Sequence, residues 1–247
     1  MADTVPQLDK TATRTGDEES DKASSNQPAV LHREVFYATR QPLLPVYAGA
    51  KIANPTPLAF MSFGVGLYLI SIVSLQVGEL KSLSIIVPVA LGYCGVSLLV
   101  AGIFEFPSGN PYGASLYCTL SGVFVSFALL LSPWSGVATS YTNPLELSQA
   151  SGQLIFAFWI TLMCFMIAAH KSPALFCGLF LVNVMLALMA VSFYYPLNTT
   201  ITKAYGGLGI VIAFGCWYCA LATLMTPESS LFQFPILGDP GRRAGLA

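Results

Sequence analysis

Few side chains in this sequence could do chemistry, and nearly all of them are uncharged. The candidates are Glu105 and the amides Asn54, Asn110 and Asn183. Asn54 and Asn110 each precede a proline, which is typical of a helix start, because asparagine caps a helix and proline fits its first turn. The free N–H groups and positive dipole end of such a start suit a carboxylate ligand. The helix-cap role is the structural reading of these residues, and a carboxylate site is the functional reading beside it.

Glu105 and Asn183 stand inside otherwise apolar stretches, where polar groups are costly and become functional candidates. Glu105, in Phe104-Glu105-Phe106, is either a carboxylate that couples protons or a charge at the level of lipid headgroups, and both readings stay open. Asn183 is expected to face a partner or a water-filled path. Ser115 and Thr119 are weaker candidates, because hydroxyl groups often bond back to their own helix.

No set of residues typical of an enzyme stands out. There is no Ser/His/Asp arrangement, metal-ligand spacing or phosphate-binding loop, and the two histidines are His32 and His170. The six cysteines all fall in apolar segments, where small apolar fillers are the expected role, even for Cys216-Trp217-Tyr218-Cys219. We therefore expect no enzyme activity, no cofactor, no metal and no disulfide.

The composition points to a protein of the lipid bilayer. Of 247 residues, 55% are hydrophobic and 9% are charged, with a mean hydropathy of +0.67, whereas a soluble domain carries about 25% charged residues. The formal net charge of −1 leaves no basic face for nucleic acid. The sequence therefore predicts an all-α integral membrane protein that does not bind nucleic acid.

Six segments are long and apolar enough to cross a bilayer as helices, which takes about 20 residues. Their apolar runs are continuous, whereas strands of a membrane barrel would alternate, and backbone in lipid must satisfy its own hydrogen bonds. The expected spans are 56–77, 83–104, 113–131, 152–169, 173–194 and 204–225.

The charged residues divide the chain into three regions. Thirteen of the 23 formal charges fall in residues 1–51, seven in 52–236 and three in the last eleven residues. We expect a disordered polar cytoplasmic tail over 1–50, since it has no apolar period, a transmembrane domain over 51–236 and a short cytoplasmic tail over 237–247. No secretory signal is expected at the start.

The flanking basic residues orient the spans. With the N-terminus inside, the cytoplasmic side collects six Lys or Arg residues and the other side only Lys81 and Lys203. The sequon Asn198-Thr199-Thr200 then falls on an outer loop. Both termini are therefore expected in the cytoplasm.

Several motifs resemble those of the acetate uptake transporter family, which includes bacterial succinate–acetate permeases, fungal acetate permeases and proposed ammonia-export relatives. Asn-Pro-Thr-Pro-Leu-Ala-Phe at 54–60 resembles its Asn-Pro-Ala-Pro-Leu-Gly-Leu signature. Phe104-Glu105-Phe106 with Gly109-Asn110-Pro111-Tyr112-Gly113 resembles its glutamate followed by Gly-Asn-Thr-Phe-Gly. His170-Lys171-Ser172 and the segment 207–228 resemble its basic turn and its last span. The long N-terminal tail and the changed motif residues favour a divergent fungal-type member.

The resemblance implies six helices per protomer, cytoplasmic termini, the plasma membrane, and a homo-hexamer with one path per protomer. It implies acetate-like short monocarboxylates as substrates, moved with protons or through a channel-like pore. It also implies a narrow constriction from spans one, three and five, which by alignment corresponds to Phe63, Leu120 and Asn183. The expected substrate-binding residues are Asn54, Thr56, Asn110, Tyr112, Ser115 and Thr119, and Glu105 is the expected proton-coupling group.

Two alternatives share this fold. One is an ammonia or ammonium exporter, although the spans offer few carboxylates beyond Glu105 for a cation. The other is a transport-dead sensor or scaffold that signals through residues 1–50. The leading hypothesis is a transporter or channel for acetate and similar acids.

Overall fold

The computed structural model describes residues 53–80, 82–169 and 173–225, and these ranges contain helices and turns and no strand. Six helices in them are long and apolar enough to cross a membrane, which confirms the all-α fold with six spans. The expected tails over 1–50 and 237–247 lie outside the described residues, as do Lys81, His170 and Lys171.

The first span is α3 (Thr56–Ser74), and the third to sixth are α6 (Pro111–Leu131), α7 (Pro144–Ala168), α8 (Pro173–Tyr194) and α9 (Thr199–Leu224). The second span, Leu83–Glu105, is built of several pieces: a 3-10 turn (Leu83–Ile85), α4 (Ile86–Val89), a π-helical segment (Ala90–Gly95) and α5 (Val96–Glu105). Two further 3-10 turns, Pro133–Ser135 and Ala138–Ser140, connect α6 to α7.

Two spans begin earlier than the apolar runs indicate. α7 starts at Pro144, where 152 was expected, and α9 starts at Thr199, where 204 was expected. An asparagine side chain caps each start: Asn143 accepts the Leu145 N–H at 3.0 Å and Asn198 accepts the Thr200 N–H at 3.1 Å. Their polar first turns extend beyond the apolar stretch, so hydropathy alone places both starts too late.

A side chain of a neighbouring helix donates a hydrogen bond to a backbone carbonyl of the π-helical segment in the second span. A π turn inside an α-helix interrupts the regular ladder of backbone bonds. The hydroxyl of Ser121 on α6 donates to the Gly95 carbonyl at 2.7 Å, and the Cys94 thiol donates to the Ser62 carbonyl of α3 at 3.1 Å. The irregular segment is therefore tied to both α3 and α6.

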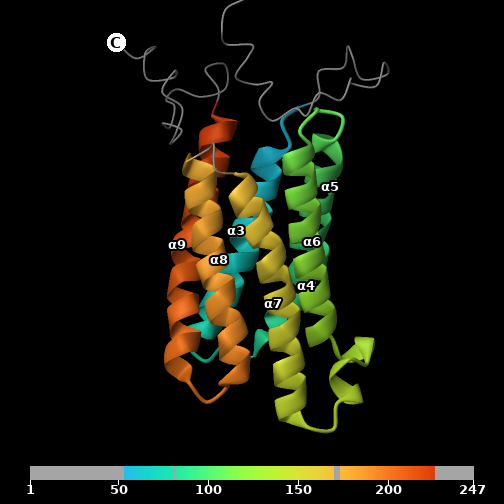
Figure 1. The fold of residues 1–247 in the computed structure, drawn as a ribbon, viewed down its shortest axis with the longest axis vertical. Coiled ribbons are helices and arrows are strands. Elements are labelled where there is room, and N and C mark those ends of the chain that lie inside the picture. The colour runs from blue at the N-terminus through green and yellow to red at the C-terminus, as the bar shows by residue number, and fades with distance from the viewer. Residues whose placement is uncertain (1–52, 81, 170–172, 226–247) are drawn as a thin grey trace, which may run out of the picture. The chain divides into compact units, whose positions relative to one another are not determined.

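The helices pack in neighbouring pairs. α3 packs most extensively against α9, α7 against α8, and α5 against α6 (Figure 1). Glycines allow two close approaches: a Cβ at Gly66 would lie 2.8 Å from the Cys94 sulfur, and one at Gly209 would lie 2.9 Å from the end of Met185. Replacement of either glycine would force its neighbours apart.

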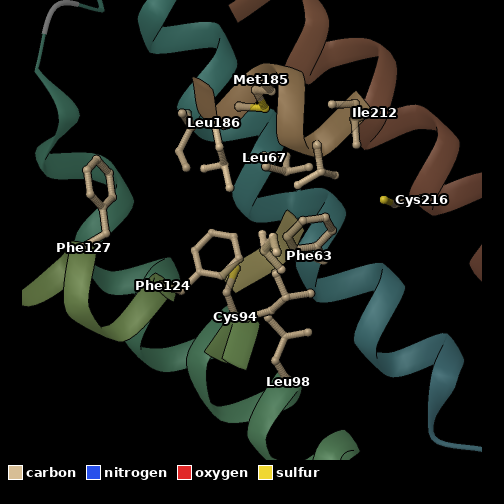
Figure 2. Packing of buried hydrophobic residues seen from close by; sticks show 14 of the residues in the cluster. Phe63, Leu67, Cys94, Leu98, Phe124, Phe127, Met185, Leu186, Ile212 and Cys216 are labelled. Carbon is tan, nitrogen blue, oxygen red and sulfur yellow. The ribbon is translucent and has the colours of Figure 1, made fainter. Parts of the chain in front are cut away.

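The core draws on all six spans, including α4 and the π-helical segment of the second span. Phe63 of α3 and Phe124 of α6 meet edge to face, with ring centroids 5.9 Å apart, and Leu67, Met185 and Leu186 surround them (Figure 2). The start of α3, the end of α5 and the start of α6 lie at one end of these helices. The end of α3 meets the start of α9 at the other end, where Ser74 bonds to Tyr205.

Candidate functional site

Glu105 lies at the end of α5 and is buried, with 3% of its surface exposed. The Thr56 hydroxyl of α3 donates to its Oε1 at 3.0 Å, and the Asn110 amide Nδ2 donates to its Oε2 at 2.9 Å. Both carboxylate oxygens thus accept a hydrogen bond, an arrangement that suits the ionised form. Glu105 is held by protein groups rather than left at an exposed surface.

Asn110 links three parts of this site. Its Oδ1 accepts the Gly113 N–H at 3.0 Å and so caps α6, while its Nδ2 holds Glu105. Its backbone N–H also bonds to the Glu105 carbonyl at 3.1 Å. A Cβ at Gly113 would lie 3.1 Å from the Asn110 Cγ and 3.3 Å from the Glu105 Cδ, so glycine leaves room for this contact. One asparagine both starts a helix and positions the carboxylate.

Tyr117 completes the site, and sequence reasoning missed it. Its hydroxyl lies next to the Thr56 side chain and interacts electrostatically with Glu105 and Tyr112. Its ring meets Phe60 edge to face, with centroids 6.5 Å apart. The available signal was its position one helical turn before Leu120 on α6. We call Thr56, Glu105, Asn110 and Tyr117 the Glu105 cluster.

An apolar cavity lies further along α3 and α6. Its volume is about 40 Å³, and one water molecule needs about 10–15 Å³. All of its lining side chains are aliphatic, aromatic or thioether groups from α3, α6, α7 and α8: Phe63, Leu67, Ile70, Leu120, Val123, Phe124, Phe127, Ile155, Leu162, Val182, Met185, Leu186 and Met189.

The Glu105 cluster and the cavity lie on the same stretch of helix. Thr56 precedes Phe63 by seven residues on α3, a rise of about 10 Å. The Phe60–Tyr117 ring pair stands between them, since Phe60 is one turn before Phe63 and Tyr117 one turn before Leu120. The polar groups thus lie towards one end of this stretch, and the apolar cavity lies further along it.

Two expected constriction residues, Phe63 and Leu120, line the cavity, and both are buried. Asn183 is buried beside it but is not among the lining residues, whereas Val182 and Leu186 are. Its Nδ2 donates to the Leu179 carbonyl at 2.8 Å and to the Leu162 carbonyl of α7 at 3.4 Å. Its Oδ1 is buried and has no hydrogen-bond partner.

The other expected substrate-binding residues occupy different places. Thr56 and Asn110 belong to the Glu105 cluster. Asn54 is exposed and accepts the Thr56 N–H at 3.0 Å. The half-buried Tyr112 donates its hydroxyl to the Phe165 carbonyl of α7 at 2.8 Å. Ser115 is exposed and Thr119 half-buried, and neither lines the cavity.

No group of metal-ligating side chains occurs among the residues that the structure describes. The six cysteines are free thiols, with Cys94 and Cys216 buried. In the same part of the chain the charged residues are three glutamates and Lys203, and Lys203 is two residues before Tyr205, at the opposite end of α3 from Thr56. The Glu105 carboxylate is thus balanced by hydrogen-bond donors and by no described cation.

Comparison with known proteins gives one family. A family model described as the GPR1/FUN34/yaaH family matches residues 36–238. The chain is 30% identical over 204 residues to the glyoxylate pathway regulator of Yarrowia lipolytica, covering 81% of this chain and 76% of that protein. It is 27% identical over 198 residues to ammonia transport outward protein 2 of Saccharomyces cerevisiae, covering 80% and 70%.

Two further likenesses concern acetate. Acetate permease A of Emericella nidulans is 25% identical over 232 residues, covering 85% of this chain and 78% of that protein. The solved structure of the bacterial acetate channel SatP superposes with a TM-score of 0.66 at 22% identity, covering 75% of this chain and 99% of that one. That likeness establishes a shared fold.

Proposed function

The chain belongs to the GPR1/FUN34/yaaH family, and we propose that it is a membrane transporter or channel for acetate and similar short-chain monocarboxylates, not an enzyme. The observation that carries this proposal is the change from polar to apolar surroundings along α3 and α6. A buried polar cluster around Glu105 leads to an apolar cavity lined by Phe63 and Leu120. A relative with 78% of its length covered is named an acetate permease.

In this proposal the polar residues near the start of α3 and α6 receive the substrate. The residues that would receive it at this end of the helices are Asn54, Thr56, Asn110 and Tyr112. Ser115 and Thr119, further along α6, would follow. In this proposal Phe63, Leu120 and Asn183 form the constriction, and Val182 and Leu186 of α8 line the cavity next to Asn183. Transport is proton-linked, and Glu105 is the group that sets the coupling.

The cellular setting is part of the proposal. Both ends of the chain lie in the cytoplasm, as expected from six spans and from the flanking basic residues. The protein resides in the plasma membrane and forms a homo-hexamer in which each protomer has its own path. Crosslinking in native membranes followed by mass measurement tests the assembly, and protease accessibility of the tails tests the orientation.

The decisive experiment is uptake of radiolabelled acetate by proteoliposomes containing the purified chain. Saturable uptake that unlabelled acetate abolishes is expected. Absence of saturable uptake at every pH, with protein that elutes as a single folded species, would overturn the proposal. The matched control is protein-free liposomes of the same lipid, because acetic acid crosses bilayers unaided.

Two alternatives have specific support. The relative named an ammonia transport outward protein favours ammonium export on the same fold, and competition of labelled acetate uptake by ammonium would support it. The relative named a glyoxylate pathway regulator favours a sensor role. For a sensor, deletion of residues 1–50 would abolish signalling while leaving any acetate uptake intact.

A further inference from the structure

We propose that the substrate crosses the cavity as the undissociated acid, and that Glu105 is the specificity-determining residue that rejects the carboxylate anion. This inference rests on the proposed function and specifies which form of the substrate the same site admits. Two observations carry it: the setting of Glu105 and the nature of the cavity.

Glu105 already occupies the place that would suit an incoming carboxylate. The Thr56 hydroxyl and the Asn110 amide, which could hold a substrate anion, both donate to Glu105 instead, at 3.0 and 2.9 Å. Asn110 Oδ1 in turn covers the Gly113 N–H at the start of α6. An arriving anion thus finds both groups already bonded to Glu105 and the Glu105 carboxylate beside them.

The strength of this exclusion follows from Coulomb's law. At an effective dielectric constant of about 20, a like charge about 8 Å away lowers the local anion concentration roughly thirtyfold. A neutral acid is unaffected by the charge and keeps an O–H to donate.

The cavity beyond the cluster has no group that could carry a proton separately from the substrate. All of its lining residues are apolar, so it holds neither a titratable side chain nor a polar group for an anion. Moving an ionised carboxylate into such surroundings is very costly, whereas a neutral acid pays little. The proton that accompanies transport therefore crosses on the substrate, and Glu105 couples the two by excluding the anion.

The test measures the effect of membrane potential on acetate uptake into proteoliposomes, with potassium gradients and valinomycin setting the potential at constant pH. A current carried by one elementary charge changes about fiftyfold over 100 mV. We expect wild-type uptake to be insensitive to an inside-positive potential. We expect Glu105→Gln, which keeps an oxygen and a side chain of the same size, to admit the anion, so that the same potential raises its uptake about tenfold or more.

The exposed residues Glu79 and Glu146 supply matched controls. Glu79→Gln and Glu146→Gln remove the same charge outside the cluster and should keep the wild-type insensitivity to potential. Wild-type uptake driven by an inside-positive potential would overturn the inference, even if Glu105→Gln does not fold. Folded Glu105→Gln that transports without responding to potential would also overturn it. Complete absence of saturable acetate uptake by folded wild-type protein would instead overturn the proposed function.

Discussion

Asn110 and Glu105 form a pair that joins the start of one membrane helix to the end of another. The Asn110 side chain bonds to Oε2 of Glu105 at 2.9 Å and its backbone N–H bonds to the Glu105 carbonyl at 3.1 Å. The same side chain caps α6 through Gly113. One residue thus caps a helix and holds a buried carboxylate, and comparison with a residue that only caps can weigh the two contacts.

The first prediction compares Asn110, which caps α6 and holds Glu105, with Asn143, which caps α7. Asn110→Ala should cost about 1 kcal/mol for the lost cap and about 1–3 kcal/mol more for leaving a buried acceptor without its donor. Asn143→Ala removes a similar cap from α7, where Asn143 is exposed and its side-chain oxygen accepts the Leu145 N–H. It should cost about 1 kcal/mol.

Thermal unfolding of both variants in one detergent measures this difference. The melting temperature should fall more for Asn110→Ala than for Asn143→Ala, and acetate uptake should fall only for Asn110→Ala. Equal shifts for the two variants would mean that the bond to Glu105 contributes little.

The second prediction concerns the donor on the other side of the carboxylate. Thr56→Val keeps the shape of the side chain but removes the hydroxyl that donates to Oε1 of Glu105. We expect a loss of about 1–3 kcal/mol, because a buried acceptor loses its partner, together with a several-fold fall in acetate uptake. Thr56→Ser keeps the hydroxyl and should retain most of the uptake. Uptake that falls in Thr56→Ser but is kept in Thr56→Val would point instead to packing of the methyl group, which Val retains and Ser lacks.

The third prediction concerns the close approach of α3 to α6. A Cβ at Gly66 would meet the Phe124 ring and lie 2.8 Å from the Cys94 sulfur. Overpacking of this kind costs about 1–3 kcal/mol, so Gly66→Ala should lower the melting temperature. Gly178→Ala on α8 is the control, because a Cβ there meets nothing within 4 Å. A shift of the same sign and size in both variants would contradict the contact.

The helices were predictable because hydropathy is a property of one segment at a time. All six spans follow from apolar runs, and the cap Asn110 stands in an Asn-Pro motif that the sequence displays, whereas the sequence shows the cap Asn198 only as part of a sequon. The start of α7 was missed although Asn143-Pro144 repeats the Asn-Pro pattern of 54–55 and 110–111, because the residues after it are polar.

The site was only partly predictable, because its parts come from different segments. Thr56, Glu105 and Asn110 were each singled out, but their bonding to one another depends on how α3, α5 and α6 pack. The facing direction of Asn183 was harder still. α8 is apolar on all sides, so its sequence gives no preferred face, and adjacent residues differ by about 100° around a helix. Val182 and Leu186 therefore line the cavity, whereas the amide of Asn183, which lies between them in the sequence, bonds to the Leu162 carbonyl of α7.

The last prediction tests Asn183 itself. Its Oδ1 is buried without a hydrogen-bond partner, and its Nδ2 bonds to carbonyls of Leu179 and Leu162. Asn183→Leu removes the unpaired oxygen while keeping much of the volume, so stability should change by about 1 kcal/mol or less. If the amide contributes to the constriction, its loss makes the passage drier and acetate uptake should fall several-fold, since apolar constrictions close by dewetting. The smaller Leu186→Val, on a residue that lines the cavity, should instead favour larger acids over acetate. Unchanged uptake by folded Asn183→Leu, with altered selectivity in Leu186→Val, would assign the α8 side of the constriction to Leu186 and leave Asn183 as a contact between α7 and α8.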